Sequence, residues 1–181
     1  YLRGFFSLCA KKIDPLILQT LLDQAEEELG HFELLKRVYE NQWGELGESF
    51  FRRVDQIKLP QIKTLADFAA ASWIFDLAGV LQMQSALACP NREYKVALKK
   101  ILREEAIHVL RGNRLRSILE TSAKKKIRID SKKWLPAGLM CFGSTESQLD
   151  VLAVKLQLKS KSAKELRLEL LRRVSAESRR T

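Results

Sequence analysis

Residues 15–42 read PLILQTLLDQAEEELGHFELLKRVYENQ and contain the pattern on which the fold prediction depends. Apolar residues recur every three or four positions along this stretch, as on one face of an α-helix. Asp14 and Pro15 are typical of a helix start, because the acidic side chain caps free amide groups and proline has no amide to cap. Gly44 and Gly47 interrupt the pattern. The stretch therefore predicts one long helix from about residue 15 to about residue 42.

Two further long helices follow in the pattern. The segment from Thr64 to Asp67 resembles a capping box and opens a helix of roughly 24 residues that ends before Pro90. Asn91 is a suitable cap for a third helix, whose apolar spacing continues from about residue 92 to about residue 121. No convincing strand pattern is present, and we therefore predict an all-α protein.

The number of helices favours a ferritin-like four-helix bundle. The segment up to Cys9 resembles the tail of a helix that begins upstream of Tyr1, and residues 43–63 have the length of the crossover that such bundles contain. We expect residues 1–122 to form the bundle, with its first helix truncated. Residues 123–181 are then a C-terminal extension packed on it.

The C-terminal extension differs from the bundle region in charge. Residues 121–181 contain 15 lysines and arginines but six acidic residues, in a chain whose formal net charge is +10. We expect a loop over residues 134–143 and then two short helices that open with capping boxes at Thr145–Gln148 and Ser162–Glu165. The basic excess suits a solvated face, the phosphates of a ligand, or an acidic partner or RNA.

The most hydrophobic stretch and the cysteines bear on whether the chain spans a membrane and on its cellular compartment. Residues 68–91 are the most hydrophobic stretch, but Asp76, several polar residues and Pro90 make it a poor membrane span, and a buried core helix is the better interpretation. The three cysteines form no CxxC pair, which favours reduced thiols in the cytoplasm over a zinc knuckle or a disulfide framework.

The two histidines carry the strongest functional signal. Each has a glutamate three residues before it, in the pairs Glu28/His31 and Glu105/His108. A spacing of three places both side chains on the same helix face, where they can bind one ion. A single pair of this kind is most often a surface pair, but fifteen glutamates in 181 residues make two chance matches improbable.

Asp76 brings a further carboxylate to the same level. It lies 12 residues before Ala88, and Glu105 lies 13 residues after Arg92, so the two have nearly equal height in antiparallel neighbours. An ionised carboxylate among Trp73, Ile74, Phe75 and Leu77 costs several kcal/mol unless it has a partner, although a protonated or hydrogen-bonded core residue is an alternative. A metal ion is the partner we predict.

Mixed carboxylate and imidazole ligation indicates two iron ions, or manganese, rather than structural zinc. The predicted metal ligands are five: Glu28, His31, Asp76, Glu105 and His108. The pattern needs a sixth ligand, and residues 1–13 contain no acidic residue. We therefore expect a glutamate upstream of Tyr1, and the alternative is a degenerate site.

Several stretches resemble the large, catalytic subunit of bacterial phenylacetyl-CoA epoxidase and its benzoyl-CoA epoxidase relatives. That family has Asp-Glu-x-Gly-His, Trp-x-x-Asp-x-Ala and Glu-Glu-x-Phe-His on successive helices, and residues 27–31, 73–78 and 104–108 are similar. Residues 139–143 match its Leu-Met-x-Phe-Gly loop. The resemblance implies an oxygenase component that acts on an aromatic acyl-CoA thioester with a reductase and a non-catalytic, homologous ferritin-like subunit.

The leading hypothesis is therefore a di-iron monooxygenase with O2 as co-substrate and electrons from an external reductase, in which Glu28, Asp76 and Glu105 are the catalytic carboxylates. Phe75, Leu77 and Ile107 are predicted to line its pocket. The alternatives are a scaffold subunit without full ligation, a di-iron hydroxylase acting on tRNA, and an iron-storage protein. A tRNA enzyme is disfavoured because no base-reading or aromatic stacking pattern is evident.

Overall fold

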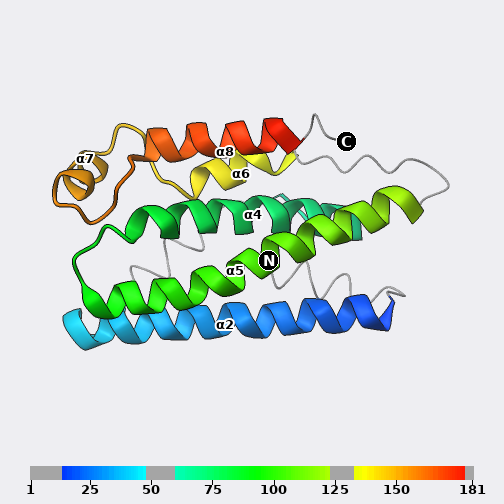
Figure 1. Cartoon of the computed structure of the whole chain (residues 1–181), viewed down its shortest axis with the longest axis horizontal. Helices are drawn as coiled ribbons and strands as arrows, with labels where there is room; N and C mark the ends of the chain where they lie inside the picture. The colour runs from blue at the N-terminus through cyan, green and yellow to red at the C-terminus, as the bar shows by residue number, and fades with distance from the viewer. Residues whose placement is uncertain (1–13, 48–59, 123–132, 178–181) are drawn as a thin grey trace. The chain divides into compact units, whose positions relative to one another are not determined.

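The computed structural model describes residues 14–47, 60–122 and 133–177, and Figure 1 shows the course of their helices. All regular structure within these ranges is α-helical, which confirms the predicted fold class. The chain divides into two compact units, Tyr1–Lys63 and Thr64–Thr181. The expected helix remnant up to Cys9 and most of the expected crossover lie outside the described residues, and the domain boundary expected at residue 122 stays a prediction.

The first unit contains helix α2, Pro15–Trp43, within one residue of its predicted end. The Asp14 side chain accepts a hydrogen bond of 2.8 Å from the amide of Leu16, as a capping residue does. The helix ends at Gly44, whose φ of 83° is in the left-handed region that glycine adopts without strain. Its buried residues recur at helical spacing along one side of the helix: Leu21, Gln24, His31 and Val38.

Helix α4, Leu65–Ala86, is the central element of the second unit. Thr64 caps it by accepting a 3.0 Å hydrogen bond from the amide of Asp67, as predicted. Buried residues occur on all sides of α4, and a helix that is apolar all round is usually a core helix. Its length and composition alone would also suit a membrane span, but most of the apolar stretch is buried within the chain, in agreement with the core-helix interpretation.

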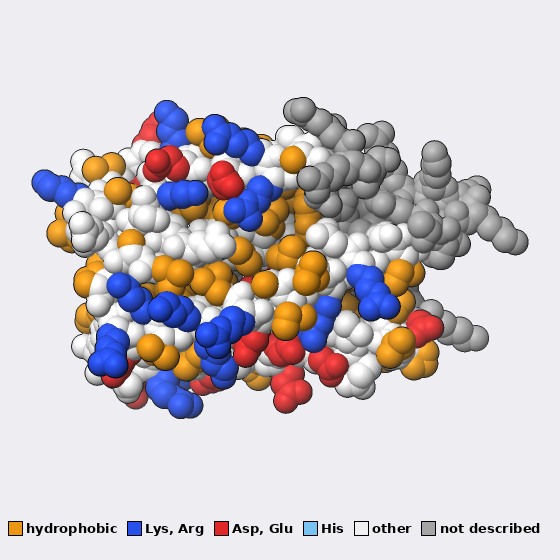
Figure 2. Space-filling view, viewed as in Figure 1, with side chains coloured by type: hydrophobic (Ala, Val, Ile, Leu, Met, Phe, Trp, Pro, Cys, Tyr) orange, Lys and Arg blue, Asp and Glu red, His pale blue; other side chains and the backbone are white. Residues whose placement is uncertain are grey.

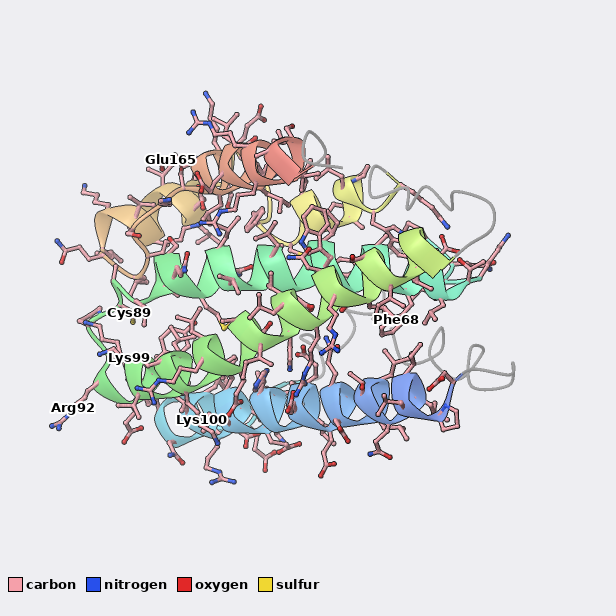
Figure 3. All side chains as sticks on the ribbon, turned by 45° about the vertical axis from the view of Figure 1, so that its right-hand side comes forward. Phe68, Cys89, Arg92, Lys99, Lys100 and Glu165 are labelled. Carbon is pink, nitrogen blue, oxygen red and sulfur yellow. The ribbon has the colours of Figure 1, made fainter. Side chains whose placement is uncertain are left out.

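Helix α5, Arg92–Ser122, returns alongside α4 after a short turn, so the two helices are antiparallel (Figure 1). Asn91 caps it, as predicted, by accepting a 2.9 Å hydrogen bond from the amide of Tyr94. In Figure 3, Cys89 lies in the turn and Arg92 extends outward from the start of α5. The helices approach closely at Gly112, where an added Cβ would lie 3.6 Å from the Cβ of Trp73.

Three shorter helices follow in the described part of the second unit: α6, Leu135–Met140, α7, Gln148–Lys155, and α8, Ala163–Glu177. The loop predicted over residues 134–143 is therefore wrong in part, because α6 forms there. The capping box predicted at Thr145–Gln148 is also wrong, since α7 begins after Ser147 without a side-chain cap. The one predicted at Ser162–Glu165 is confirmed by hydrogen bonds in both directions, 2.8 Å and 3.3 Å long.

Helices α6 and α8 both pack against α4. The turn before α8 is fixed to the end of α4 at Ser85, which accepts hydrogen bonds of 2.9 Å from the amides of Ser160 and Lys161. Among the described residues, the largest fully buried side chains come from α4, α5, α8 and the residue that precedes α6: Phe68, Ile74, Leu98, Ile101, His108, Leu166, Leu170 and Trp134. Helix α4 is thus held on several sides, and the side chains that point inward from it have fixed surroundings.

Candidate metal centre

The pair Glu105 and His108 lies on α5, on the side that is buried. The carboxylate Oε2 of Glu105 is 3.7 Å from Nδ1 of His108, and their side chains are 6% and 0% exposed. The neighbouring residue Ile107 points the other way and is 48% exposed, so the prediction that it lines an interior pocket is wrong. A single helical turn thus carries both an outward apolar residue and two inward ligating groups.

Asp76 of α4 meets this pair. Ligand atoms of Asp76, Glu105 and His108 all lie within 4.8 Å of one another, as the counting of residues from the turn predicted. Asp76 is 6% exposed, and its Oδ2 accepts a 3.0 Å hydrogen bond from the hydroxyl of Ser72, one turn earlier on the same helix. The second unit alone therefore brings together two carboxylates and one imidazole.

The charge of this cluster points to a cation. Two carboxylates this close together repel each other, and burial in a medium of low polarity disfavours the two charged groups further. A bound metal ion offsets both costs and uses the donor atoms that are present. Carboxylate oxygens and an imidazole nitrogen are the ligands of iron and manganese sites, and the residues therefore fit the predicted metal.

The second predicted pair, Glu28 and His31, lies on α2 in the first unit. Oε2 of Glu28 is 3.6 Å from Nδ1 of His31, which reproduces the internal geometry of the α5 pair. The His31 side chain is 9% exposed, but that of Glu28 is 40% exposed. The participation of these two residues in one centre with Asp76 stays a prediction.

Helix α6 packs behind the segment of α4 that carries Asp76. An added Cβ at Gly138 would overlap Cγ2 of Ile74, two residues before Asp76, so only glycine allows this approach. Trp134, 1% exposed, meets Phe75 edge to face with ring centroids 6.4 Å apart. Of the other predicted pocket residues, Leu77 is buried and Phe75 is half-buried.

Sequence reasoning missed two residues of the site. Ser72 lies four residues before Asp76, and this spacing in an otherwise apolar helix was an available signal for a hydrogen bond to the carboxylate. Gly138 had no such signal, because its role depends on Ile74, which is distant in the sequence.

The fold and the site together define an all-α protein with a buried group of carboxylates and imidazole able to hold a metal ion. The chain matches the family model of phenylacetic acid catabolic proteins over residues 19–180. It therefore belongs to that family, as the motifs indicated. No curated protein matches the chain.

Proposed function

We propose that this chain is the oxygenase component of a non-haem di-iron enzyme, one that inserts an oxygen atom from O2 into an organic substrate. The main observation in support is that the side chains of Asp76, Glu105 and His108 are buried and have ligand atoms within 4.8 Å of one another. The chain that carries them belongs to the phenylacetic acid catabolic family. Within that family, the motifs favour the large, catalytic subunit.

The proposed ligand set is the one expected from the sequence: Glu28, His31, Asp76, Glu105 and His108. Glu28, Asp76 and Glu105 hold the metal ions through carboxylate oxygens, and Ser72 fixes the orientation of one of them through its hydrogen bond to Asp76. When two iron ions, or manganese, are bound, they provide the redox chemistry that reduces O2 and transfers one oxygen atom. The apolar side chains of α4 around Asp76 exclude water from this chemistry.

The proposed substrate is an aromatic acyl-CoA thioester. Several cations of the C-terminal segment already serve the fold, since Lys133 pairs with Asp67, Lys159 with Asp150, and Arg173 with Glu169. Other cations are exposed and available to phosphates, among them Lys164 and Arg172 of α8. Electrons come in this proposal from an external reductase, in a cytoplasmic complex that includes a homologous ferritin-like subunit.

Anaerobic titration with ferrous iron, followed by exposure to O2, tests the proposal. We expect close to two irons per chain, a rise in melting temperature on loading, because metal binds the folded state, and O2 uptake that depends on reductant. The matched variant is Glu105→Ala, which removes a buried ligand. A Glu105→Ala protein that still bound two irons would contradict the assignment.

A scaffold subunit is the second candidate, and the 40% exposure of Glu28 is the observation that favours it, because a complete buried centre encloses its ligands. Absence of iron from the full-length protein after reconstitution, with the helical fold intact, would support the scaffold. Reconstitution beside the homologous subunit then decides which chain holds the metal.

A further inference from the structure

Helix α7 exposes an unusual number of large apolar side chains. Leu149, Leu152 and Leu156 are 76%, 47% and 55% exposed, and Val151 and Leu158 of the same segment are 66% and 43% exposed. Contiguous exposed apolar surface of this kind marks an interaction site more often than it occurs by accident. Hydrophobic side chains are visible at this end of the second unit in Figure 2.

The exposed residues form a narrow stripe. Leu149, Leu152 and Leu156 have the spacing i, i+3 and i+7, which places them in one row along the helix and is the pattern by which helices pack against helices. We call these three residues the α7 leucine stripe. Val151 lies toward the opposite side of α7, and Lys155 lies between the two, so α7 has no broad apolar face of the kind that lies flat on a lipid surface.

Helix α7 is held firmly in this position. The buried Asp150 accepts hydrogen bonds of 3.1 and 3.0 Å from the amide of Ala163 at the start of α8, and it forms an ion pair with Lys159. Burial acts to raise the pKa of the Asp150 carboxyl, but the hydrogen bonds from Lys159 and Ala163 and the Lys159 charge together lower it below its usual value. The carboxylate therefore stays charged at neutral pH, and the link between α7 and α8 persists.

The end of α7 is equally well defined. The amide of Leu158 donates to the carbonyl of Ala153 over 2.8 Å, and the amide of Gln157 donates to that of Val154 over 3.0 Å, which is the Schellman arrangement. Gln157 has a φ of 57°, a left-handed conformation that costs a residue with a side chain about 1 kcal/mol. The stripe is thus displayed by a rigid helix and not by a loop that could fold back over it.

The charge around the stripe indicates what covers it. From Ser147 to Lys161 the chain has three lysines and one carboxylate, and that carboxylate, Asp150, is buried and paired. Lys155 and Lys161 are exposed. A second copy of the chain in a symmetric pair would bring like charges together, since its net charge is +10. The exposed lysines beside the stripe are instead complementary to a partner surface whose apolar centre has acidic residues along its borders.

We propose that the α7 leucine stripe is the docking surface for an amphipathic helix of another protein, one with an apolar side and acidic residues along its borders. This inference does not depend on the metal centre. Removing the stripe is expected to abolish docking while iron loading remains normal, so that a failure here is distinguishable from a failure of the proposed oxygenase function.

A synthetic helical peptide of defined sequence is the probe, with leucines at i, i+3, i+4 and i+7 and glutamates on both borders, and its binding to the full chain is measured by fluorescence anisotropy. The triple variant Leu149→Ser, Leu152→Ser, Leu156→Ser is expected to weaken binding by at least about tenfold. The reason is that a few central apolar side chains contribute most of the binding free energy in such contacts, and this variant removes them. The matched control is Leu168→Ser with Leu171→Ser, two exposed leucines of α8, and is expected to stay within about twofold of the unaltered chain.

A charge-reversal pair tests the chemistry of the partner. Lys155→Glu with Lys161→Glu should weaken the glutamate-bordered peptide and strengthen a lysine-bordered one, with the difference shrinking at high salt. Equal binding of both peptides, absence of binding, or equal loss in the α8 control would overturn the proposal. So would stripe-dependent binding to phosphatidylglycerol vesicles in place of the peptide, or stripe-dependent self-association in sedimentation.

Discussion

The two Glu-x-x-His pairs have nearly the same internal geometry but different surroundings. The carboxylate and imidazole are 3.6 Å apart on α2 and 3.7 Å apart on α5. On α5 the glutamate and histidine are 6% and 0% exposed, whereas on α2 they are 40% and 9% exposed. The spacing of three residues sets the distance inside each pair, because it is a property of the helix. Exposure depends on what packs around the helix, and here the two pairs differ.

The difference has an energetic meaning. Glu105 and Asp76 are buried with ligand atoms within 4.8 Å of each other, and a bound cation relieves the repulsion between the two carboxylates, whereas the partly exposed Glu28 keeps much of its hydration. The α5 pair is therefore expected to couple metal binding strongly to stability, and the α2 pair weakly.

The largest effect is expected for Glu105→Gln compared with Glu28→Gln. Glu105→Gln should raise the unfolding free energy of the metal-free protein by about 1 to 3 kcal/mol, because it removes the repulsion between Glu105 and the buried Asp76 carboxylate, while iron affinity falls more than about 100-fold. Glu28→Gln should change the metal-free stability by less than about 0.5 kcal/mol. Denaturant unfolding and iron titration measure both. Equal effects on metal-free stability would remove the distinction between the pairs.

The next largest effect is expected where α6 packs against α4. Gly138→Ala forces a methyl group into Ile74 and should lower the unfolding free energy by about 1 to 3 kcal/mol, with a parallel loss of iron affinity. Gly112→Ala is the matched control, since its Cβ would lie at an ordinary 3.6 Å from that of Trp73. Thermal unfolding compares them. A neutral Gly138→Ala would show that α6 does not constrain the segment around Asp76.

A smaller effect is expected for Ser72→Ala, which removes the hydrogen bond to Asp76. Loss of such an orienting contact should weaken iron binding by about tenfold. Ser85→Ala is the control on the same helix, because Ser85 is equally buried but bonds the turn before α8; it should cost about 1 kcal/mol of stability and leave iron affinity unchanged. Competition with a chelator measures the affinity. Equal iron binding in both variants would mean that Ser72 does not orient the carboxylate.

The smallest effect is expected at Gly30, between Glu28 and His31, and it tests whether this side of α2 is in contact with other parts of the protein. Among the residues that the structure describes, none lies within 4 Å of a Cβ added at Gly30, which precedes His31 in the middle of the helix. Gly30→Ala should therefore raise the unfolding free energy by about 0.5 to 1 kcal/mol, the usual preference of a helix for alanine, with iron binding unaltered. A decrease in stability would indicate that another surface packs on this side of α2.

The local predictions succeeded where the determining residues are neighbours in the sequence. Caps at Asp14, Thr64, Asn91 and Ser162 are confirmed, because each depends on a side chain and an amide two or three residues away. The failures involve distant partners. Helix α6 forms where a loop was predicted, and it packs closely on α4 only because Gly138 lies against Ile74. Ile107 was predicted to line the pocket with Phe75 and Leu77, but it lies on the exposed side of α5.

The sequence by itself determined the long helices, the geometry of both Glu-x-x-His pairs and, through the short turn after α4, the common level of Asp76 and Glu105. These follow from a fixed rise and a fixed number of residues per turn. Only the tertiary structure decided that His108 is fully buried, that Ser72 bonds Asp76, and that α7 leaves its leucines exposed. The burial of a side chain depends on contacts between segments that are distant in the sequence, and it therefore cannot be predicted from the spacing of neighbouring residues.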